Sequence, residues 1–381
     1  MTSVNWSYPT AIRFGTGRIC ELAEACRAAG IQRPLFVTDR GLASLPITTD
    51  ALAQLDSEGL GSTMFSGVDA NPHDGNLSEG IAAFRAGEHD GVIAFGGGSA
   101  LDLGKLVAFM AGQTRPVWDF EDIGDWWTRA NPDAIAPNIA VPTTAGTGSE
   151  VGRASVLTNT KTHLKKVIFH PKILPVTVIC DPALTIGMPQ VITAGTGMDA
   201  FAHCLEAYSS PMYHPMGDGI ALEGMRLVLE NLPKAYNDGS DLEARGAMMS
   251  AAMMGAVAFQ KGLGGIHAIS HPVGARFNTH HGMTNAIVMP ALLRFNRHAI
   301  EDKIARAAAY LNIEGGFSGF YEAVLALRSD LSVPDSLRAL GVDDKDPDVI
   351  AAAAIEDPTA GGNPVPLTHE AARDLFLECM A

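Results

Sequence analysis

Residues 91–110 of the chain read GVIAFGGGSALDLGKLVAFM, and this stretch decides the class of fold. A short apolar run at 91–95 is followed at once by three glycines and a serine. Apolar residues then recur at three- and four-residue spacing over 100–111, which indicates a helix. A buried strand that turns through glycines directly into a helix is typical of a parallel α/β sheet.

The first half of the chain repeats this alternation of strand and helix. Strands are predicted for residues 34–39, 62–68, 91–95, 138–141 and 176–181, and helices for residues 18–29, 74–86 and 100–111. The glycine turn then follows the third strand. Residues 154–158 and 166–169, separated by a polar turn, are predicted to form a hairpin added to the same sheet. The fold class expected for this half is α/β, with a Rossmann-like parallel sheet.

The second half changes character after Pro182. Long helical patterns cover residues 194–209, 217–231 and 242–259, and almost no credible strand follows. We therefore expect two domains: an α/β domain over residues 1–183 and an all-α domain over residues 184–381.

The composition predicts a globular protein with a large core. Of the 381 residues, 47% are hydrophobic, and 27 Lys and Arg stand against 42 Asp and Glu, which gives a net charge of −15. This charge argues against a general binder of nucleic acid or of anionic membranes. No apolar stretch is long enough for a membrane helix, and the first residues do not resemble a signal peptide. The five cysteines have no CxxC spacing, so a reducing cytoplasm is the expected compartment.

The glycine turn is a candidate phosphate site. Glycines at a helix N-terminus present free backbone N–H groups and the positive end of the helix dipole, which suit a pyrophosphate. A tight connection without a ligand is the alternative. Asp39 ends an earlier strand of the same sheet, where its carboxylate would bind a ribose 2′-hydroxyl and repel a 2′-phosphate, so NAD is favoured over NADP. Its alternative role is a turn cap before Gly41. A polar loop at 141–150, VPTTAGTGSE, offers further hydroxyls.

A carboxylate and several histidines recur at helical spacing in the second half. Asp199 and His203 lie four residues apart, so a helix places both on one face. His267 and His271 repeat that spacing, and His280 and His281 follow in NTHHG. One carboxylate with three imidazoles is a donor set that suits Fe²⁺ or Zn²⁺.

These motifs together resemble the iron-containing, or group III, alcohol dehydrogenases, over nearly the whole chain. The matching segments, in the family's order, are FGTG at 14–17, GGGSALD at 96–102, PTTAGTGSE at 142–150, TGMDAFAHCLEAY at 196–208, HAISHPVGARFNTHHG at 267–282 and NPVPLTHE at 363–370. The resemblance implies a dehydroquinate synthase-like fold, with a Rossmann-like N-terminal domain and a helical metal-binding domain. It also implies an oxidoreductase that uses NAD and a divalent metal, with Fe²⁺ expected and Zn²⁺ as the alternative.

The resemblance also implies residue roles. The metal ligands would be Asp199, His203, His267 and His281. His271 matches a non-ligand histidine near the substrate, a candidate for proton relay. The dinucleotide residues would be Asp39, Gly97, Gly98, Ser99, Asp102, Thr143, Thr144, Thr147 and Lys166. His280 matches no family role.

Two cations depart from the common family pattern. Arg153 and Lys261 stand where neutral residues are more frequent, Lys261 six positions before His267. If both face the substrate, they predict an anionic group on it, as in a hydroxy acid or an acid semialdehyde. The alternative is that Arg153 pairs with Glu150 or a surface carboxylate, while Lys261 is solvated or contacts another subunit.

The activity expected is hydride transfer between nicotinamide and a small alcohol, aldehyde or ketone, assisted by a metal. The alternatives in the same fold are a glycerol dehydrogenase, a dehydroquinate synthase or a maleylacetate reductase. A metal-dependent hydrolase and a non-catalytic protein are alternatives of other classes. Edge strands in the α/β domain make a homodimer the expected assembly.

Overall fold

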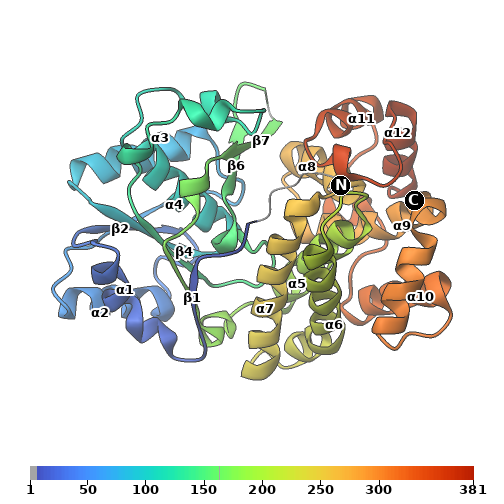
Figure 1. Ribbon diagram of the computed structural model, residues 1–381, viewed down its shortest axis with the longest axis horizontal. Helices are drawn as coiled ribbons and strands as arrows, with labels where there is room; N and C mark the ends of the chain where they lie inside the picture. The colour runs from blue at the N-terminus through green and yellow to red at the C-terminus, as the bar shows by residue number, and fades with distance from the viewer. Residues whose placement is uncertain (1–6, 163) are drawn as a thin grey trace. The chain divides into compact units, whose positions relative to one another are not determined.

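The computed structural model describes residues 7–162 and 164–381 of the chain. They form two compact units (Figure 1). The α/β unit contains Tyr8–Thr144 and Ser149–Gly187, and the helical unit contains Met188–Ala381 together with the short segment Ala145–Gly148. The chain therefore leaves the α/β unit briefly at the polar loop, Ala145–Gly148, and returns to it at Ser149.

A six-stranded parallel sheet forms the centre of the α/β unit. Its strands are β1 (Ala11–Phe14), β2 (Pro34–Asp39), β3 (Thr63–Val68), β4 (Gly91–Gly96), β5 (Asn138–Pro142) and β8 (Thr177–Cys180). They lie in the order β1-β8-β5-β4-β2-β3, and every neighbouring pair is parallel. The carboxyl ends of β2, β4 and β5 therefore meet at one edge of the sheet.

Two elements of this unit, β1 and α2, were not predicted from the sequence. Strand β1 is four residues long and half exposed at the edge of the sheet, so it lacks a buried apolar run. The glycine turn consequently follows the fourth strand in chain order, not the third. Helix α2 (Pro46–Ser57) buries only three of its residues, which gives a weak apolar periodicity.

Helices cover both faces of the sheet (Figure 1). These are α1 (Leu22–Ala28), α2, α3 (Asp74–Ala86) and α4 (Gly98–Met110). Side chains alternate along the strands: Leu35 and Val37 join the core beneath α3 and α4, while Phe36 joins the core beneath α1 and α2. Strands buried on both faces explain the uninterrupted apolar runs in the sequence.

The predicted hairpin forms, but its predicted place is wrong. Strands β6 (Ala154–Asn159) and β7 (Leu164–Phe169) form a separate antiparallel pair and add no strand to the main sheet. Leu157 and Ile168 on this pair are fully buried in the same core as Leu106 of α4. The hairpin therefore covers a helix, because its apolar residues pack there while the sheet already ends in β1 and β3.

The second unit is helical, and no strand is assigned between residues 182 and 381. Its helices are α5 (Gln190–Ser209), α6 (Pro215–Asn237), α7 (Leu242–Ala258), α8 (Gly265–Phe277), α9 (His281–Tyr310), α10 (Gly316–Asp330), α11 (Pro347–Glu356) and α12 (His369–Glu378). The predicted fold class, a Rossmann-like α/β domain with an all-α domain, is confirmed.

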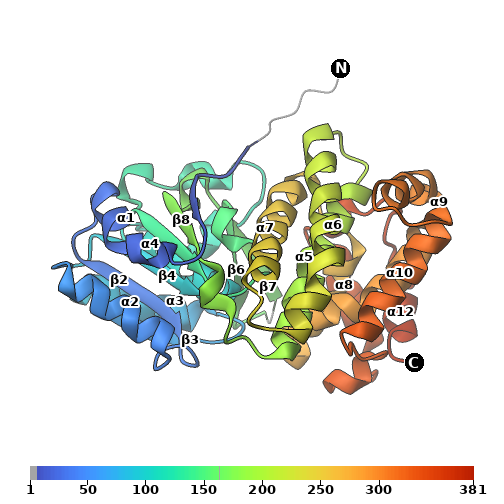
Figure 2. The same cartoon turned by 90° about the horizontal axis from the view of Figure 1, so that it is seen from below.

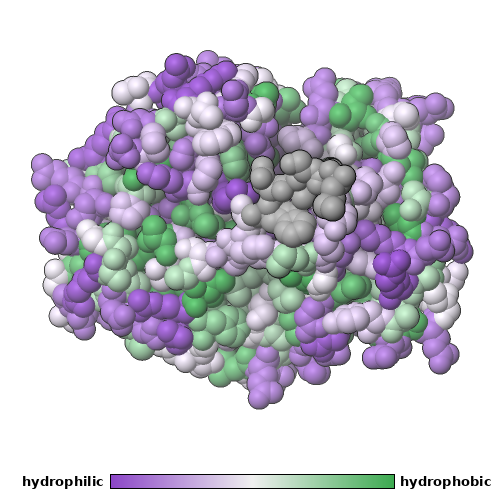
Figure 3. Space-filling view, viewed as in Figure 1, coloured by the Kyte–Doolittle hydropathy of each residue, from purple (hydrophilic) through white to green (hydrophobic). Residues whose placement is uncertain are grey.

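Helices α5, α6 and α7 lie side by side (Figures 1 and 2). Small residues permit this: a Cβ on Gly224 of α6 would lie 2.5 Å from Cys204 Sγ, and one on Gly255 of α7 would lie 2.9 Å from His203 Cβ. Hydrophilic side chains cover much of the face shown in Figure 3. Among the described residues, no helix combines the length and apolar character needed to cross a membrane.

Candidate metal and dinucleotide sites

Three buried potential metal donors lie close together in the helical unit. Asp199 and His203 are one turn apart on α5, and His267 lies in the first turn of α8. One ligand atom from each of the three residues lies within 4.8 Å of the others, and all three side chains are buried. Helical periodicity alone predicted that Asp199 and His203 lie together, whereas His267, on α8, joins them only through tertiary packing.

The start of α9 adds His281 to this cluster. Its Nε2 lies 3.4 Å from Asp199 Oδ1, while the Nε2 atoms of His203 and His267 lie 3.7 and 3.6 Å from the same oxygen. A tetrahedral ion with bonds of about 2.1 Å separates its ligand atoms by about 3.4 Å. Asp199, His203 and His267 therefore suit a divalent metal in both chemistry and spacing, and His281 lies close enough to Asp199 Oδ1 to be a fourth candidate donor.

A close contact between two helices brings His281 to Asp199. Gly282 lies against Gly195 of α5, where a Cβ on Gly282 would be 1.9 Å from the Gly195 carbonyl oxygen. His280 packs on the same glycine, and its Nδ1 accepts a hydrogen bond from Met283 N–H at 3.3 Å. The histidine without a family role is thus the N-cap of α9.

Two of the buried donors, Asp199 and His203, have the charge that metal binding needs. Burial raises the pKa of the Asp199 carboxyl, but the neighbouring histidines lower it well below its usual range. Burial lowers the pKa of His203 to about 4, so its imidazole is neutral at pH 7. Metal ligands need an ionised carboxylate and neutral imidazoles, and Asp199 and His203 are in these states at pH 7. Burial lowers the pKa of His267, but Glu206 and Asp199 raise it to about 9, so a metal ion would have to displace a proton from this ring.

His271 lies one turn after His267 on α8, beside the cluster. Its ring is stacked 5.4 Å from the ring of His281. Its Nδ1 lies 2.8 Å from Asp357 Oδ2, and the other oxygen of Asp357 accepts hydrogen bonds from the amide and hydroxyl of Thr359. Burial opposes ionisation of Asp357, but His271 and Thr359 bring the pKa of this carboxyl below its usual value. An ionised Asp357 therefore orients His271.

Asn285 is a residue of the cluster that the sequence analysis missed. Its Nδ2 donates to Asp199 Oδ1 at 2.8 Å and lies 3.2 Å from the Nε2 atoms of His267 and His281. Helical spacing offered a signal, because Asn285 is four residues after His281 on α9. No pattern in the sequence linked Asp357 to His271, because the two residues are 86 positions apart in the chain.

The residues predicted to bind a dinucleotide partly converge at the carboxyl edge of the sheet. Gly97 is the N-cap of α4, and no side chain caps that helix, so its first N–H groups suit a phosphate. Thr143 N–H donates to the Gly96 carbonyl at 3.0 Å, and a Cβ on Gly97 would lie 3.3 Å from Thr144 Cγ2. The strand ends thus place the glycine turn beside the two threonines.

Asp39 lies at the same edge, at the end of β2. Its Oδ1 accepts hydrogen bonds from the N–H groups of Gly41 and Leu42, at 2.8 and 3.0 Å. Its Oδ2 would be 3.5 Å from a Cβ on Gly96. The turn-cap role and a position beside the glycine turn are therefore compatible, because each uses a different oxygen.

Other members of the predicted dinucleotide set bind within the protein. Ser99 Oγ donates to the Ala70 carbonyl at 2.6 Å, and Lys166 Nζ lies 3.2 Å from Glu121 Oε2. Asp102 accepts hydrogen bonds from Ser149 Oγ and Val156 N–H, one on each oxygen. Gly98 begins α4, and Thr147 belongs to the segment grouped with the helical unit. The contacts of these residues to a dinucleotide stay predictions.

The two unusual cations have different surroundings. Lys261 Nζ is buried, donates to the Tyr208 carbonyl at 3.1 Å and forms an ion pair with Asp218 at 2.5 Å. The idea that Lys261 is solvated is therefore wrong, and its partner Asp218, which also pairs with Lys303, belongs to the helical unit. The guanidinium of Arg153 lies 5.4 Å from the centre of the Phe169 ring, and its charge lowers the pKa that burial raises at Asp122.

Comparison with known proteins identifies the family of both halves. The family described as iron-containing alcohol dehydrogenase matches residues 9–182, and its C-terminal domain matches residues 193–380. A 4-hydroxybutyrate dehydrogenase from Cupriavidus necator is 39% identical, covering 94% of each chain. A 1,3-propanediol dehydrogenase from Citrobacter freundii is 37% identical, covering 93% of each.

A solved structure gives the same result for the fold. A crystal structure of 1,3-propanediol oxidoreductase matches with a TM-score of 0.94 and 35% identity, covering all of both chains. The resemblance predicted from the motifs is confirmed. Both curated relatives and the solved structure are named as dehydrogenases or oxidoreductases. The comparisons therefore favour an oxidoreductase over the alternatives of a metal-dependent hydrolase and a non-catalytic protein.

Proposed function

Because the chain belongs to the iron-containing alcohol dehydrogenase family, we propose residue roles for its reaction. The reaction itself is the NAD-dependent, metal-assisted interconversion of an alcohol with an aldehyde or ketone. The proposed metal ligands are Asp199, His203, His267 and His281. The observation that carries this set is the buried cluster in which donors from three residues lie within 4.8 Å.

The bound metal would supply a Lewis acid that polarises the substrate oxygen. Asp199 provides the anionic donor, and its three histidine neighbours provide neutral nitrogens. Asn285 holds Asp199 Oδ1 in place through a hydrogen bond of 2.8 Å. Fe²⁺ is the proposed ion and Zn²⁺ the alternative, since both accept this donor set.

His271 is the proposed proton carrier. Its Nδ1 is held by Asp357 at 2.8 Å, so Nε2 is the nitrogen that would exchange a proton with the substrate or a water. The ionised Asp357 stabilises the positive charge that His271 gains when it accepts the proton. The ring of His271 stacks on that of His281, a proposed metal ligand. This position supports the role, because the substrate oxygen that gains or loses the proton would lie beside the metal.

The proposed dinucleotide site is the carboxyl edge formed by β2, β4 and β5. The uncapped N-terminus of α4 would bind the pyrophosphate, and Thr143 and Thr144 border it. Asp39 Oδ2 would accept a hydrogen bond from a ribose hydroxyl and would repel a 2′-phosphate, which favours NAD over NADP.

The proposed substrate is a short primary alcohol, or its aldehyde, that carries a second polar group. The relatives named for 4-hydroxybutyrate and 1,3-propanediol support this class. Arg153 favours 4-hydroxybutyrate over 1,3-propanediol, because a guanidinium can bind a carboxylate through two hydrogen bonds and only the hydroxy acid carries one. We therefore propose a hydroxy acid as the preferred substrate. Lys261 is left out of this proposal, since it is paired with Asp218.

The deciding experiment measures NADH oxidation by protein loaded with Fe²⁺ or Zn²⁺, with His267→Ala as the control. The panel compares 4-oxobutanoate with 3-hydroxypropanal and neutral aldehydes. We expect turnover that His267→Ala abolishes, and a preference for 4-oxobutanoate that Arg153→Ala reduces. An unchanged ratio of kcat/KM values in Arg153→Ala would refute the hydroxy-acid proposal while leaving the reaction class intact.

A homodimer in the cytoplasm completes the proposal. The exposed edge strand β1 supports pairing between copies, and none of the five cysteines, all of which the structure describes, forms a disulfide, which is compatible with a reducing compartment. Sedimentation equilibrium would test the dimer, and a monomer at micromolar concentration would refute it.

A further inference from the structure

Glu206 is a buried carboxylate that the roles above do not use. It lies on α5, seven residues after Asp199 and three after His203, and its exposed fraction is 6%. A carboxylate buried to this degree is unfavourable unless hydrogen bonds satisfy both of its oxygens. Its place on the same face of the ligand-bearing helix suggests that its partners belong to the metal centre.

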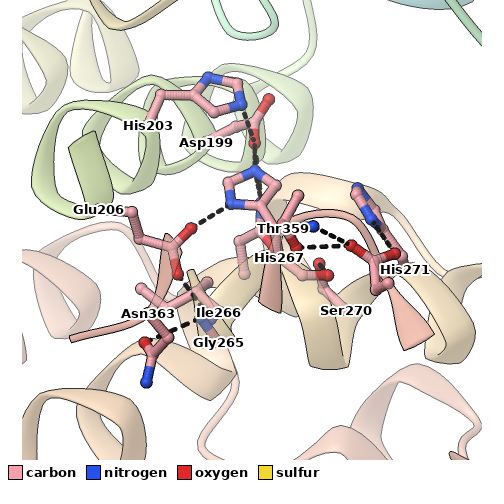
Figure 4. A network of polar contacts seen from close by, with 12 residues as sticks. Asp199, His203, Glu206, Gly265, Ile266, His267, Ser270, His271, Thr359 and Asn363 are labelled. Atoms are coloured by element: carbon pink, nitrogen blue, oxygen red, sulfur yellow. Dashed lines mark hydrogen bonds and ion pairs between the residues drawn. The ribbon is translucent and has the colours of Figure 1, made fainter. Parts of the chain in front are cut away.

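Both oxygens of Glu206 accept hydrogen bonds from the first turn of α8. Oε1 accepts from Ile266 N–H at 2.6 Å, and Oε2 lies 2.6 Å from His267 Nδ1. Figure 4 shows the carboxylate extending from α5 toward α8, with the His267 ring next to it. One side chain therefore satisfies a free N–H of a helix terminus and also contacts a proposed metal ligand.

The adjacent N–H group of the same turn has a separate acceptor. Gly265 N–H donates to Asn363 Oδ1 at 3.0 Å. Gly264 makes room for both acceptors, because a Cβ there would lie 2.9 Å from Asn363 Oδ1 and 3.0 Å from Glu206 Oε1. Asn363 thus supports the start of α8 without touching His267, and Glu206 does both.

The contact at Nδ1 determines what the other nitrogen of His267 can do. A carboxylate oxygen only accepts hydrogen bonds, so the proton of a neutral His267 resides on Nδ1. Nε2 then keeps its lone pair and faces Asp199 Oδ1 at 3.6 Å. The same hydrogen bond restricts rotation of the ring. A carboxylate that accepts the N–H of the nitrogen not bound to the metal usually has this effect on a metal-bound histidine.

The charge of Glu206 also matches a divalent ion. Asp199 is the only anion among the four proposed ligands, so the ligand set carries one negative charge. Glu206 adds a second negative charge within the same buried region. Two carboxylates balance a divalent cation where water cannot screen it.

We propose that Glu206 is a positioning residue of the metal centre, which holds His267 with its proton on Nδ1 and its Nε2 directed at the ion. The inference rests on the ligand set of the proposed function. Glu206 acts through His267 and does not touch the substrate.

The test measures the affinity of the protein for Zn²⁺ and Co²⁺ in chelator-buffered titrations at one pH. Glu206→Gln keeps the size of the side chain, but its amide has a single acceptor oxygen and cannot bind both Ile266 N–H and His267 Nδ1–H. Asn363→Ala is the matched control, because it removes a hydrogen bond from the same helix terminus. We expect Glu206→Gln to weaken binding by about 10- to 100-fold, and Asn363→Ala to change it far less.

A second measurement observes the proton on His267 directly, starting from the wild-type protein. In zinc-loaded protein with ¹⁵N-labelled histidine, His267 should show a protonated Nδ1 with a strongly downfield proton resonance. The resonance is assigned by its absence in His267→Ala, and it should be lost or shifted in Glu206→Gln.

The outcomes separate this inference from the proposed function. If His267→Ala keeps wild-type metal affinity, the ligand set is wrong and the inference falls with it. If His267→Ala loses the metal while Glu206→Gln binds it as tightly as the wild type, only the role of Glu206 is overturned. Equal losses in Glu206→Gln and Asn363→Ala would also overturn it, because capping of α8 would then explain both.

Discussion

The proposed metal cluster and the proposed phosphate site at the glycine turn would bind their ligands through different groups. The proposed ligands of the cluster come from three helices: those on α5 and α8 are buried, while His281 on α9 is partly exposed, and the place of each depends on the packing of its helix. The turn uses backbone N–H groups at the start of one helix, next to the ends of neighbouring strands. A site of the first kind depends on tertiary contacts, while a site of the second kind is largely set by local sequence.

The largest effect should follow from removing the shared anion of the cluster. Asp199 Oδ1 lies within 3.7 Å of three histidine nitrogens. Asp199→Ala should therefore abolish tight metal binding and lower kcat/KM by on the order of 10³-fold or more, since it removes a direct donor. NAD binding to the edge of the sheet should persist, as measured by calorimetry. Loss of both affinities together would contradict the separation of the two sites.

The packing that brings His281 to Asp199 can be tested at Gly282. A Cβ at this position would be 1.9 Å from the Gly195 carbonyl oxygen, so α9 must move away from α5 in Gly282→Ala. We expect the free energy of unfolding to fall by roughly 3 kcal/mol or more, with weaker metal binding.

A glycine in open space provides the control for Gly282. Gly219 lies within α6, and a Cβ there would contact nothing within 4 Å. Gly219→Ala should raise stability by about 0.5 to 1 kcal/mol, because alanine favours the helix. Equal stability of the two variants in urea denaturation would show that the contact of α9 with α5 is not required.

Buried carboxylates in the two units should respond to pH in opposite ways. Histidines lower the pKa of Asp199, whereas burial raises the pKa of Glu150 in the α/β unit to about 7, despite the nearby Lys105. In the unfolded chain Glu150 ionises near pH 4.5, so its contribution to stability is full below that pH and is lost as pH rises to about 7. Glu150→Gln should flatten this loss, which is on the order of 3 kcal/mol.

The measurement is the free energy of unfolding of wild type and Glu150→Gln between pH 4 and 8. The two proteins should differ most above pH 7, with the variant the more stable. A constant difference over the whole range would contradict the raised pKa, because the substitution would then act only through packing.

The smallest loss of function should come from a change in the glycine turn. Gly96 has a φ of 143°, which disfavours a residue with a Cβ, and a Cβ there would lie 2.8 Å from Ala100 Cβ. Gly96→Ala should distort the turn and weaken NAD binding by about tenfold, which corresponds to about 1.4 kcal/mol. Zn²⁺ affinity should be unchanged, since the cluster lies in the other unit. An unaltered Kd for NAD would refute the proposed phosphate site.

Local patterns of the sequence determined much of the fold. Strands such as β2 and helices such as α3 begin and end where the alternation and periodicity predict. The glycine turn and the Asp199–His203 pair also followed, because backbone geometry fixes neighbours over one turn of chain. The edge strand β1 was missed because it is short and half exposed, so its pattern is weak.

Only the tertiary structure decided the contacts between distant segments. It placed the hairpin on α4, paired Lys261 with Asp218, and brought Asp357 to His271. It also joined Glu206 to His267 and Asn285 to Asp199. Such contacts depend on how helices pack through glycines and core side chains, and the sequence periodicity that identifies a buried face does not identify the partner that covers it.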